Sequence, residues 1–127
     1  MGTSGGIFEI DQKGETIIVT PVTDLRELDY QQIEDGMSDV ISHLIRMAVK
    51  NVVMDFHQTD YFGTTALGCF LKLWKRVRSR NGRMAFCNVS ENEKEVLRIT
   101  KLDSLWTIWP SKEEALRAVR ELGVEGC

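Results

Sequence analysis

The sequence lacks the features that mark a membrane protein, a secreted protein or a metalloprotein. No run of apolar residues approaches the roughly 20 that a membrane span needs. The first six residues have neither the basic flank nor the apolar stretch of a secretory signal, and Gly6 breaks the myristoylation pattern that Met-Gly would open. Three cysteines without CxxC spacing and two histidines form no metal-binding pattern. We therefore expect a protein of the reducing cytoplasm without a membrane segment, a metal or another cofactor.

The chain also lacks a large excess of charge of either sign. The formal net charge is -3, which argues against a nucleic-acid-binding protein that depends on its global charge. Positive residues do gather between positions 72 and 83. We interpret this cluster as the solvated face of a helix, and a nucleic-acid or anionic-surface binding module is the alternative. The cluster consists of Lys72, Lys75, Arg76, Arg78, Arg80 and Arg83.

What is present is the composition of an ordinary globular domain. The chain has 127 residues, of which 43% are hydrophobic and 28% charged, enough to build one core. It shows no internal repeat, low-complexity tract or linker. We expect a flexible N-terminus over residues 1–6, one domain over 7–122 and a C-terminal tail over 123–127. Cys69 and Cys87 lie in apolar segments and are interpreted as core residues.

The first third of the chain predicts a hairpin followed by a helix. Residues 7–10 and 16–21 are strand candidates, and the turn between them, over 11–14, is short enough to require an antiparallel pair. Apolar residues then recur at helical spacing over 33–48. Asp29 is the expected N-cap just ahead of this helix.

The middle of the chain predicts a strand, a helix and another strand. Residues 51–56 are uniformly apolar in their centre, which is typical of a strand buried on both faces. A helix follows over 64–81, with apolar residues on one face and basic residues on the other. Gly82 is the expected helix stop, and the chain resumes as a strand over 84–87.

Two helices close the sequence, with a strand between them over 105–109. Each of these helices opens with a capping box, and Gly123 is expected to end the second. The element order is therefore ββαβαβαβα, in which helical crossovers require the later strands to run parallel. The fold class is α/β: a single domain with a mixed five-stranded sheet, its first strand antiparallel and the rest parallel, and four helices. The capping boxes pair Ser90 with Glu93 and Ser111 with Glu114.

The segment that leaves the central strand is the best candidate for a functional site. It ends at the carboxyl edge of the sheet, where ligands and partners usually meet an α/β domain. Thr64 and Thr65 stand at the start of the next helix, where either can cap the helix. A phosphate is favoured at the same place by the free amides and the helix dipole. The spacing alone is compatible both with capping threonines and with a phosphorylated hydroxyl.

The sequence resembles the STAS domains, above all the anti-sigma factor antagonists. Their Asp-Ser-Ser-Gly-Leu-type motif between central strand and helix corresponds here to residues 63–67, Gly-Thr-Thr-Ala-Leu. The resemblance continues through Asn81-Gly82-Arg83-Met84, residues 96–102 and residues 111–116, and covers roughly residues 7 to 122. Three departures are visible. Gly63 stands for the family's acidic residue, Ala66 for its glycine, and residues 21–25 do not match its Gly-x-Leu-Asp pattern.

The resemblance implies a regulatory switch that binds a protein partner. In that family the first serine of the motif is phosphorylated by the partner, an anti-sigma factor that is itself a kinase, and the unphosphorylated form binds it. Thr64 falls on this position, and Thr65 is the fallback acceptor. The implied partner is an anti-sigma factor or ATP-dependent serine/threonine kinase, and a homodimer is left open. A constitutive scaffold that is never phosphorylated is the alternative. The implied partner-binding residues are Asp60, Tyr61, Phe62, Gly63, Thr64 and Thr65.

No pattern predicts catalysis. His43 and His57 lie outside any nucleophile, phosphate-loop or metal-binding motif, and we expect surface or hydrogen-bonded roles for them. Asp55 and Asp60 are close enough in sequence for a carboxylate pair, although capping and loop stabilisation explain them equally well. Thr59, Tyr61 and Phe62 lie in the loop, where an exposed aromatic can anchor a partner and at least one side chain is expected to plug the core. Trp74, Trp106 and Trp109 are interpreted as packing residues.

Overall fold

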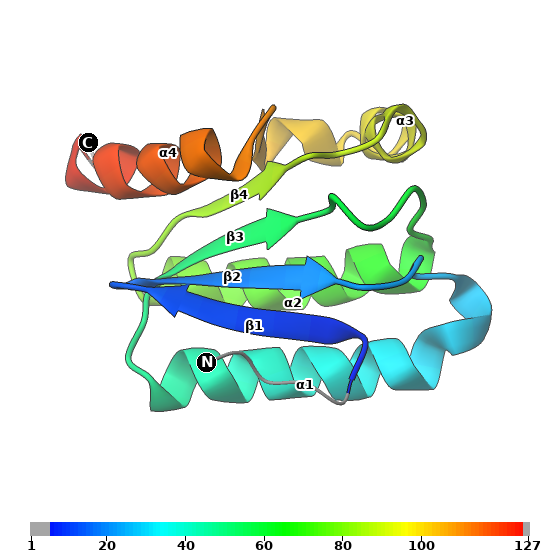
Figure 1. Ribbon diagram of the computed structural model, residues 1–127, viewed down its shortest axis with the longest axis horizontal. Helices are drawn as coiled ribbons and strands as arrows, with labels where there is room; N and C mark the ends of the chain where they lie inside the picture. Colours follow the sequence, from blue (N-terminus) through cyan, green and yellow to red (C-terminus); the bar gives the residue numbers. More distant parts are fainter. Residues whose placement is uncertain (1–5, 126–127) are drawn as a thin grey trace.

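The computed structural model describes the backbone of residues 6–125 and the side chains of residues 6–120 (Figure 1). Five strands form a single sheet, and four α-helices and two short 3-10 helices connect them. The strands are β1 (Phe8–Lys13), β2 (Thr16–Pro21), β3 (Asn51–Asp55), β4 (Met84–Cys87) and β5 (Thr107–Trp109). The helices are η1 (Glu27–Asp29), α1 (Tyr30–Arg46), α2 (Thr64–Ser79), α3 (Glu91–Ile99), η2 (Leu102–Ser104) and α4 (Lys112–Glu125).

The strand order in the sheet is the order in the chain, β1-β2-β3-β4-β5. β1 pairs with β2 antiparallel, and the three remaining pairs are parallel. The predicted fold class is therefore confirmed: one mixed α/β domain with its first strand antiparallel. Because β3, β4 and β5 are parallel, their carboxyl ends meet at one edge of the sheet, and the loops that follow them share that edge.

The two faces of the sheet are covered unequally. Strand residues alternate between the faces, so Ile17 and Val19 belong to the larger core while Ile18 belongs to the smaller one. Helices α1 and α2 cover the larger core, and α4 covers the other face through Ala115 and Val119 (Figure 1). Complete burial on both faces is the reason β3 reads as an unbroken apolar run.

An aromatic cluster fills the larger core beneath the carboxyl edge of the sheet. The rings of Phe56 and Phe62 meet edge to face with centroids 5.2 Å apart, and Phe70 lies 5.5 Å from Phe62. Phe86 stacks on Trp106 at 4.7 Å. Offset and edge-to-face contacts of this kind are the favoured geometries of aromatic pairs. The loop that contains Phe62 is thus fixed to the core before it reaches α2.

Several predicted boundaries are wrong, for identifiable reasons. β1 runs to Lys13 because an edge strand keeps its backbone ladder after its apolar alternation ends, so residues 11–13 are strand rather than turn. Helix α1 starts at Tyr30, before the first buried position. β3 ends at Asp55, one residue before the expected Phe56. The fifth strand begins only at Thr107, because η2 and a turn occupy the preceding residues.

The helix ends also differ from the predictions. The left-handed residue after α2 is Asn81, with φ of 61°, and not Gly82. Gly82 is needed for another reason: a Cβ there would lie 1.6 Å from the carbonyl oxygen of Lys50. Helix α4 continues through Gly123 to Glu125, because a glycine permits a helix to stop without forcing it to. The expectations for residues 1–5 and 126–127, including Cys127, lie outside the described residues.

Other details agree with the sequence. Cys69 and Cys87 are buried, and burial raises the pKa of both thiols. The box of Ser90 with Glu93 is complete. In the second box, Ser111 Oγ accepts a hydrogen bond from the Glu114 amide at 3.2 Å, while the Glu114 side chain binds the Ser111 hydroxyl at 3.3 Å. Only the first half of that second box therefore has the predicted geometry.

Candidate functional site

The loop between β3 and α2 is held by a short parallel bridge to the loop after β2. Leu25 pairs with Phe62, and both side chains are buried. The Leu25 amide donates to the carbonyl oxygen of Tyr61 at 3.1 Å, and the Gly63 amide donates to the carbonyl oxygen of Leu25 at 2.9 Å. Two loops that are distant in sequence thus form one rigid platform at the carboxyl edge of the sheet.

Glu27, from the first of these loops, caps the start of α2. The N-cap position is occupied by Gly63, which has no side chain to accept the free amides. The Glu27 Oε2 atom accepts a hydrogen bond from the Thr64 amide at 3.1 Å, and Oε1 accepts one from the Tyr61 hydroxyl at 3.3 Å. The expectation that Thr64 or Thr65 caps the helix is therefore wrong. Thr64 is the first residue of the helix, and the cap comes from 37 residues earlier in the chain.

The electrostatics of this contact follow from its geometry. The Thr64 amide, with smaller contributions from the Glu27 amide and the Tyr61 hydroxyl, lowers the pKa of Glu27 below its ordinary value of 4.5. Desolvation, together with the Glu27 charge, raises the pKa of Tyr61. Near neutral pH a carboxylate and a neutral phenol therefore lie together at the positive end of the helix dipole.

Gly63 leaves the space that this carboxylate occupies. Its φ of -102° is open to any residue, so the backbone does not require a glycine there. A Cβ at this position would instead lie 2.2 Å from Glu27 Oε2 and 2.4 Å from its carboxyl carbon. The absence of a side chain at position 63 and the presence of a carboxylate at position 27 are two parts of the same arrangement.

The same loop is tied to the start of α3. The Thr59 hydroxyl donates to Glu93 Oε2 at 2.6 Å, and the Ser90 hydroxyl donates to the carbonyl oxygen of Asp60 at 3.0 Å. Asn92 donates to Asp60 Oδ2 at 2.8 Å. Glu93 is fully buried, and this burial raises the pKa of its carboxyl group despite the hydrogen bonds that it accepts. The loop is thus anchored on both sides of Asp60.

The exposed part of this platform combines acidic and apolar groups. Leu28 is 94% exposed, and Tyr61 is 36% exposed. Glu27, Asp60 and Thr64 are exposed around them. We call this set the Thr64 surface: Glu27, Leu28, Asp60, Tyr61 and Thr64.

The structure brings together part of the predicted set and removes another part from the surface. Phe62 is completely buried against Phe56 and Phe70, so the expectation that it contacts a partner is wrong and its role is to plug the core. Gly63 is buried beneath Glu27, and Thr65 is half-buried.

Sequence reasoning missed Glu27 and Leu28. The only signal for them was an apolar residue in the Arg26-Glu27-Leu28-Asp29 run, outside the helical period.

Several residues of the rival sites have structural contacts of their own. Asp55 bonds to His57 and Asp60 to Asn92, so the two carboxylates have separate partners. Among the basic residues, Arg78 stacks over Trp74 at 4.8 Å and Arg80 donates to the carbonyl oxygen of Val49 at 3.1 Å. Within the described chain no group of three or more His, Cys, Asp or Glu residues could hold a metal ion. None of the helices between residues 6 and 125 is long and apolar enough to cross a membrane.

Comparison with known proteins gives a consistent result. The sequence profile of the STAS domain matches residues 8–115. An anti-sigma-factor antagonist (STAS) domain protein from Planctomyces limnophilus is 25% identical, with a TM-score of 0.77 over 89% of this chain and 97% of that one. The anti-sigma factor antagonist SpoIIAA in its unphosphorylated form is 20% identical, with a TM-score of 0.77 over 90% of this chain and 96% of that one. The Bacillus cell fate determinant SpoIIAA in its phosphorylated form is 18% identical, with a TM-score of 0.69 over 88% of this chain and 98% of that one.

Proposed function

Because this chain belongs to the STAS domain family, we propose that it is a regulatory switch that binds a protein partner through the Thr64 surface. The observation that carries the proposal is the exposure of Thr64 at the start of α2, beside an exposed leucine and a tyrosine. Aromatic and apolar side chains of this kind are the usual anchors of protein interfaces. The rigid platform beneath them supports binding without rearrangement of the backbone.

The proposed partner is an anti-sigma factor or an ATP-dependent serine/threonine kinase, with Thr64 as the phosphate acceptor and Thr65 as the fallback. This finer proposal is supported by the SpoIIAA structures, which exist for phosphorylated and unphosphorylated forms of a protein with the same fold. It is also supported by the position of Thr64, whose exposed side chain a kinase can reach more easily than that of half-buried Thr65. We propose no catalytic activity for the chain itself, and a role in transcription regulation in the cytoplasm.

The structure suggests how a phosphate would act on this surface. A phosphorylated threonine adds about -1.5 to -2 charges and three acceptor oxygens. That group and the Glu27 carboxylate compete for the same Thr64 amide, and their like charges repel at close range. In this proposal the phosphate takes the amides of α2 and displaces Glu27. Leu28 is the adjacent residue of η1, so this change of charge takes place beside the apolar anchor of the surface.

The test first isolates an ATP-dependent kinase by pull-down with the wild-type chain, and then compares Thr64→Asp, Thr64→Ala and Thr65→Ala in binding to it. We expect Thr64→Ala to bind the kinase but not to accept phosphate. Thr64→Asp should remain folded but bind at least about tenfold more weakly, because burying an unpaired charge in an interface costs on the order of several kcal/mol. Thr65→Ala should bind and be phosphorylated. Phosphosite mapping by mass spectrometry and calorimetry measure both properties.

Equal affinity of Thr64→Asp and wild type would leave the constitutive scaffold as the better description. Phosphate transfer to Thr65 in the wild-type chain would show that Thr65, and not Thr64, is the phosphate acceptor. A homodimer is checked by sedimentation velocity on the same samples. We do not propose the nucleic-acid alternative, and within its basic cluster Arg78 stacks on Trp74 and Arg80 binds the Val49 carbonyl.

A further inference from the structure

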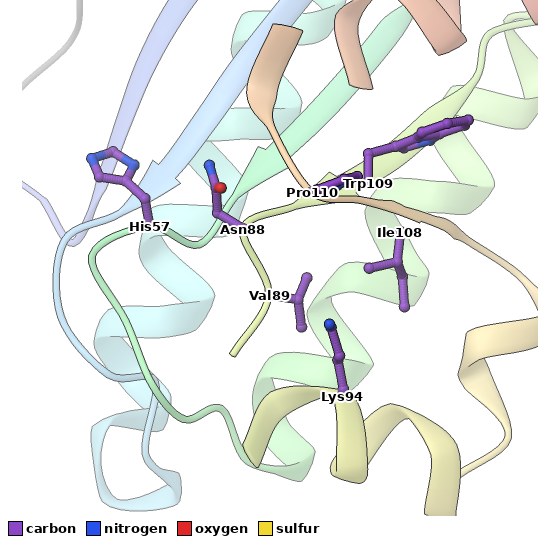
Figure 2. A pocket seen from close by; sticks show the side chains of 7 residues that line it. All are labelled: His57, Asn88, Val89, Lys94, Ile108, Trp109 and Pro110. Atoms are coloured by element: carbon purple, nitrogen blue, oxygen red, sulfur yellow. The ribbon is translucent and has the colours of Figure 1, made fainter. Parts of the chain in front are cut away.

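A concave region lies at the carboxyl edge of the sheet, separate from the Thr64 surface (Figure 2). It has a volume of about 550 Å³ and lies where β3, β4 and β5 end. Ligands of α/β domains are usually bound at this edge. None of its lining residues belongs to the Thr64 surface. The lining residues are His57, Asn88, Val89, Lys94, Ile108, Trp109 and Pro110.

A buried carboxylate fixes the polar side of this hollow. The Asp55 side chain is 4% exposed and lies behind the lining residues, at the end of β3. It accepts hydrogen bonds from the His57 amide at 3.1 Å and from Asn88 Nδ2 at 2.9 Å, and its Oδ2 atom lies 3.0 Å from His57 Nδ1. These contacts hold the imidazole and the carboxamide in place. A site whose polar groups are oriented by an inner set of hydrogen bonds is preorganised for a ligand.

The backbone around Asn88 is fixed as well. Asn88 has a left-handed conformation with φ of 55°, which asparagine tolerates better than most residues. Its amide donates to the carbonyl oxygen of Trp109 at 3.2 Å, which joins the ends of β4 and β5. This hydrogen bond holds the two strand ends together at the edge of the hollow.

The remaining walls are apolar, and the only formal charge on them is positive. Val89 is buried and Ile108 half-buried, and Lys94 extends from α3 toward both of them (Figure 2). No acidic residue is among the described residues that line the hollow. Lys94 Nζ does lie 3.4 Å from Glu91 Oε2, but Glu91 is 92% exposed at its side chain. An exposed pair of this kind contributes little and exchanges readily with another anion.

From these observations we propose that the hollow binds a small organic anion. Its carboxylate or phosphate group faces Lys94 and the polar rim of His57 and Asn88, and its apolar part packs on Val89 and Ile108. An apolar cavity with a few fixed polar groups is the usual form of a small-molecule site.

The test is an NMR titration of the full chain with phenyl phosphate as the probe. Inorganic phosphate presents the charge alone, and benzyl alcohol presents a similar ring without the charge. We expect phenyl phosphate to shift the amides of Val89, Ile108 and Trp109 in a saturable way, and to bind at least about tenfold more tightly than either comparison compound. Lys94→Gln should weaken its binding about tenfold, as is usual for a hydrogen bond to a charged group.

The matched control is Lys75→Gln, which removes an exposed lysine from the last turns of α2 and should leave binding unchanged. Lys94→Glu reverses the charge and should abolish binding, while its amide spectrum reports that the fold is intact. The proposal is overturned by the absence of saturable shifts, by equal affinity in Lys94→Gln and wild type, or by benzyl alcohol binding as tightly as phenyl phosphate. Because the Thr64 surface shares no residue with the hollow, none of these outcomes bears on the partner-binding proposal.

Discussion

The carboxylate of Glu27 accepts the backbone amide of Thr64 at 3.1 Å, across 37 residues of sequence. This contact satisfies one of the free amides at the start of α2 and places a negative charge where the helix dipole favours it. It also joins the segment before α1 to the segment before α2. The candidate acceptor residue and its nearest carboxylate are therefore one structural unit, and each can be tested through the other.

Removing this carboxylate should destabilise the domain in a pH-dependent way. Glu27→Gln keeps the size of the side chain but lacks the charge. Because hydrogen bonding lowers the pKa of Glu27 in the folded state, its contribution is fully present above 4.5 and is lost as the pH falls through the lowered folded value. We expect wild type to exceed Glu27→Gln in stability from neutral pH down to about 5, with the difference shrinking below that. Urea denaturation from pH 3 to 7 measures it, and a constant difference would contradict the expectation.

A side chain at position 63 should destabilise the domain because it clashes with Glu27. Shortening Glu27 should restore part of that stability. Gly63→Asp would bring a Cβ within 2.2 Å of the Glu27 carboxylate, so Glu27 must leave the helix start. In Gly63→Asp with Glu27→Ala, the new aspartate can cap α2 itself. We expect the double variant to melt above Gly63→Asp alone, so that the two losses are not additive. Thermal unfolding of all four members of the cycle measures this. Additive losses would show that positions 27 and 63 are independent.

The buried carboxylate of Glu93 should give the opposite pH dependence. Burial raises its pKa, so its contribution to stability is fully present below the ordinary value of 4.5 and is lost as the pH rises through the folded value. Glu93→Gln removes the titration and can still bond to Thr59 and to the Ser90 amide. We expect the stability of Glu93→Gln relative to wild type to increase as the pH rises from about 4 to about 7. Stability curves that stay parallel across this range would show that Glu93 does not titrate differently in the fold.

Two glycines of the α2 region should respond in opposite ways to alanine. At Gly82 a Cβ would meet the carbonyl oxygen of Lys50 at 1.6 Å, a backbone atom that cannot move without disturbing β3. We expect Gly82→Ala to lower the free energy of unfolding by about 3 kcal/mol, as overpacking does.

Gly68 is the matched control for Gly82, because it lies exposed within α2 and a Cβ added there would meet nothing within 4 Å. Gly68→Ala should stabilise the domain by about 0.5 to 1 kcal/mol through helix propensity. Chemical denaturation of both variants gives the comparison. A neutral Gly82→Ala would mean that the chain after α2 shifts freely.

The elements that could be predicted are those with a local pattern. The apolar run of β3 and the period of α1 record burial that neighbouring residues share, so both were recoverable from the sequence. The ends of β1 and β5 were not, because they depend on backbone pairing at the sheet edges rather than on side-chain burial. Gly82 was expected as the helix stop, but Asn81 takes the left-handed conformation, and the close Lys50 carbonyl explains the glycine at position 82.

The candidate site was predictable in place but not in composition. The position of Thr64 followed from the strand-to-helix transition. Its contact with Glu27 did not, because two exposed polar residues so far apart in the sequence leave no periodic signal. The burial of Phe62 was open for the same reason: an aromatic in a loop can face either way, and its Phe56 and Phe70 neighbours decide which. Asp55 shows the limit again, since only the fold reveals that it orients His57 and Asn88.

The strand order has a consequence for how the chain is made. Each strand of the sheet lies next to the one that was synthesised immediately before it. As the chain leaves the ribosome, β1 and β2 can pair first, and every later strand then finds its neighbour already exposed beside it. No strand depends on a pairing partner that is synthesised much later, so few unpaired, aggregation-prone strand edges persist during translation. The face that α4 covers is the last to be closed, and the nascent domain is most vulnerable to aggregation there until residue 125 has emerged.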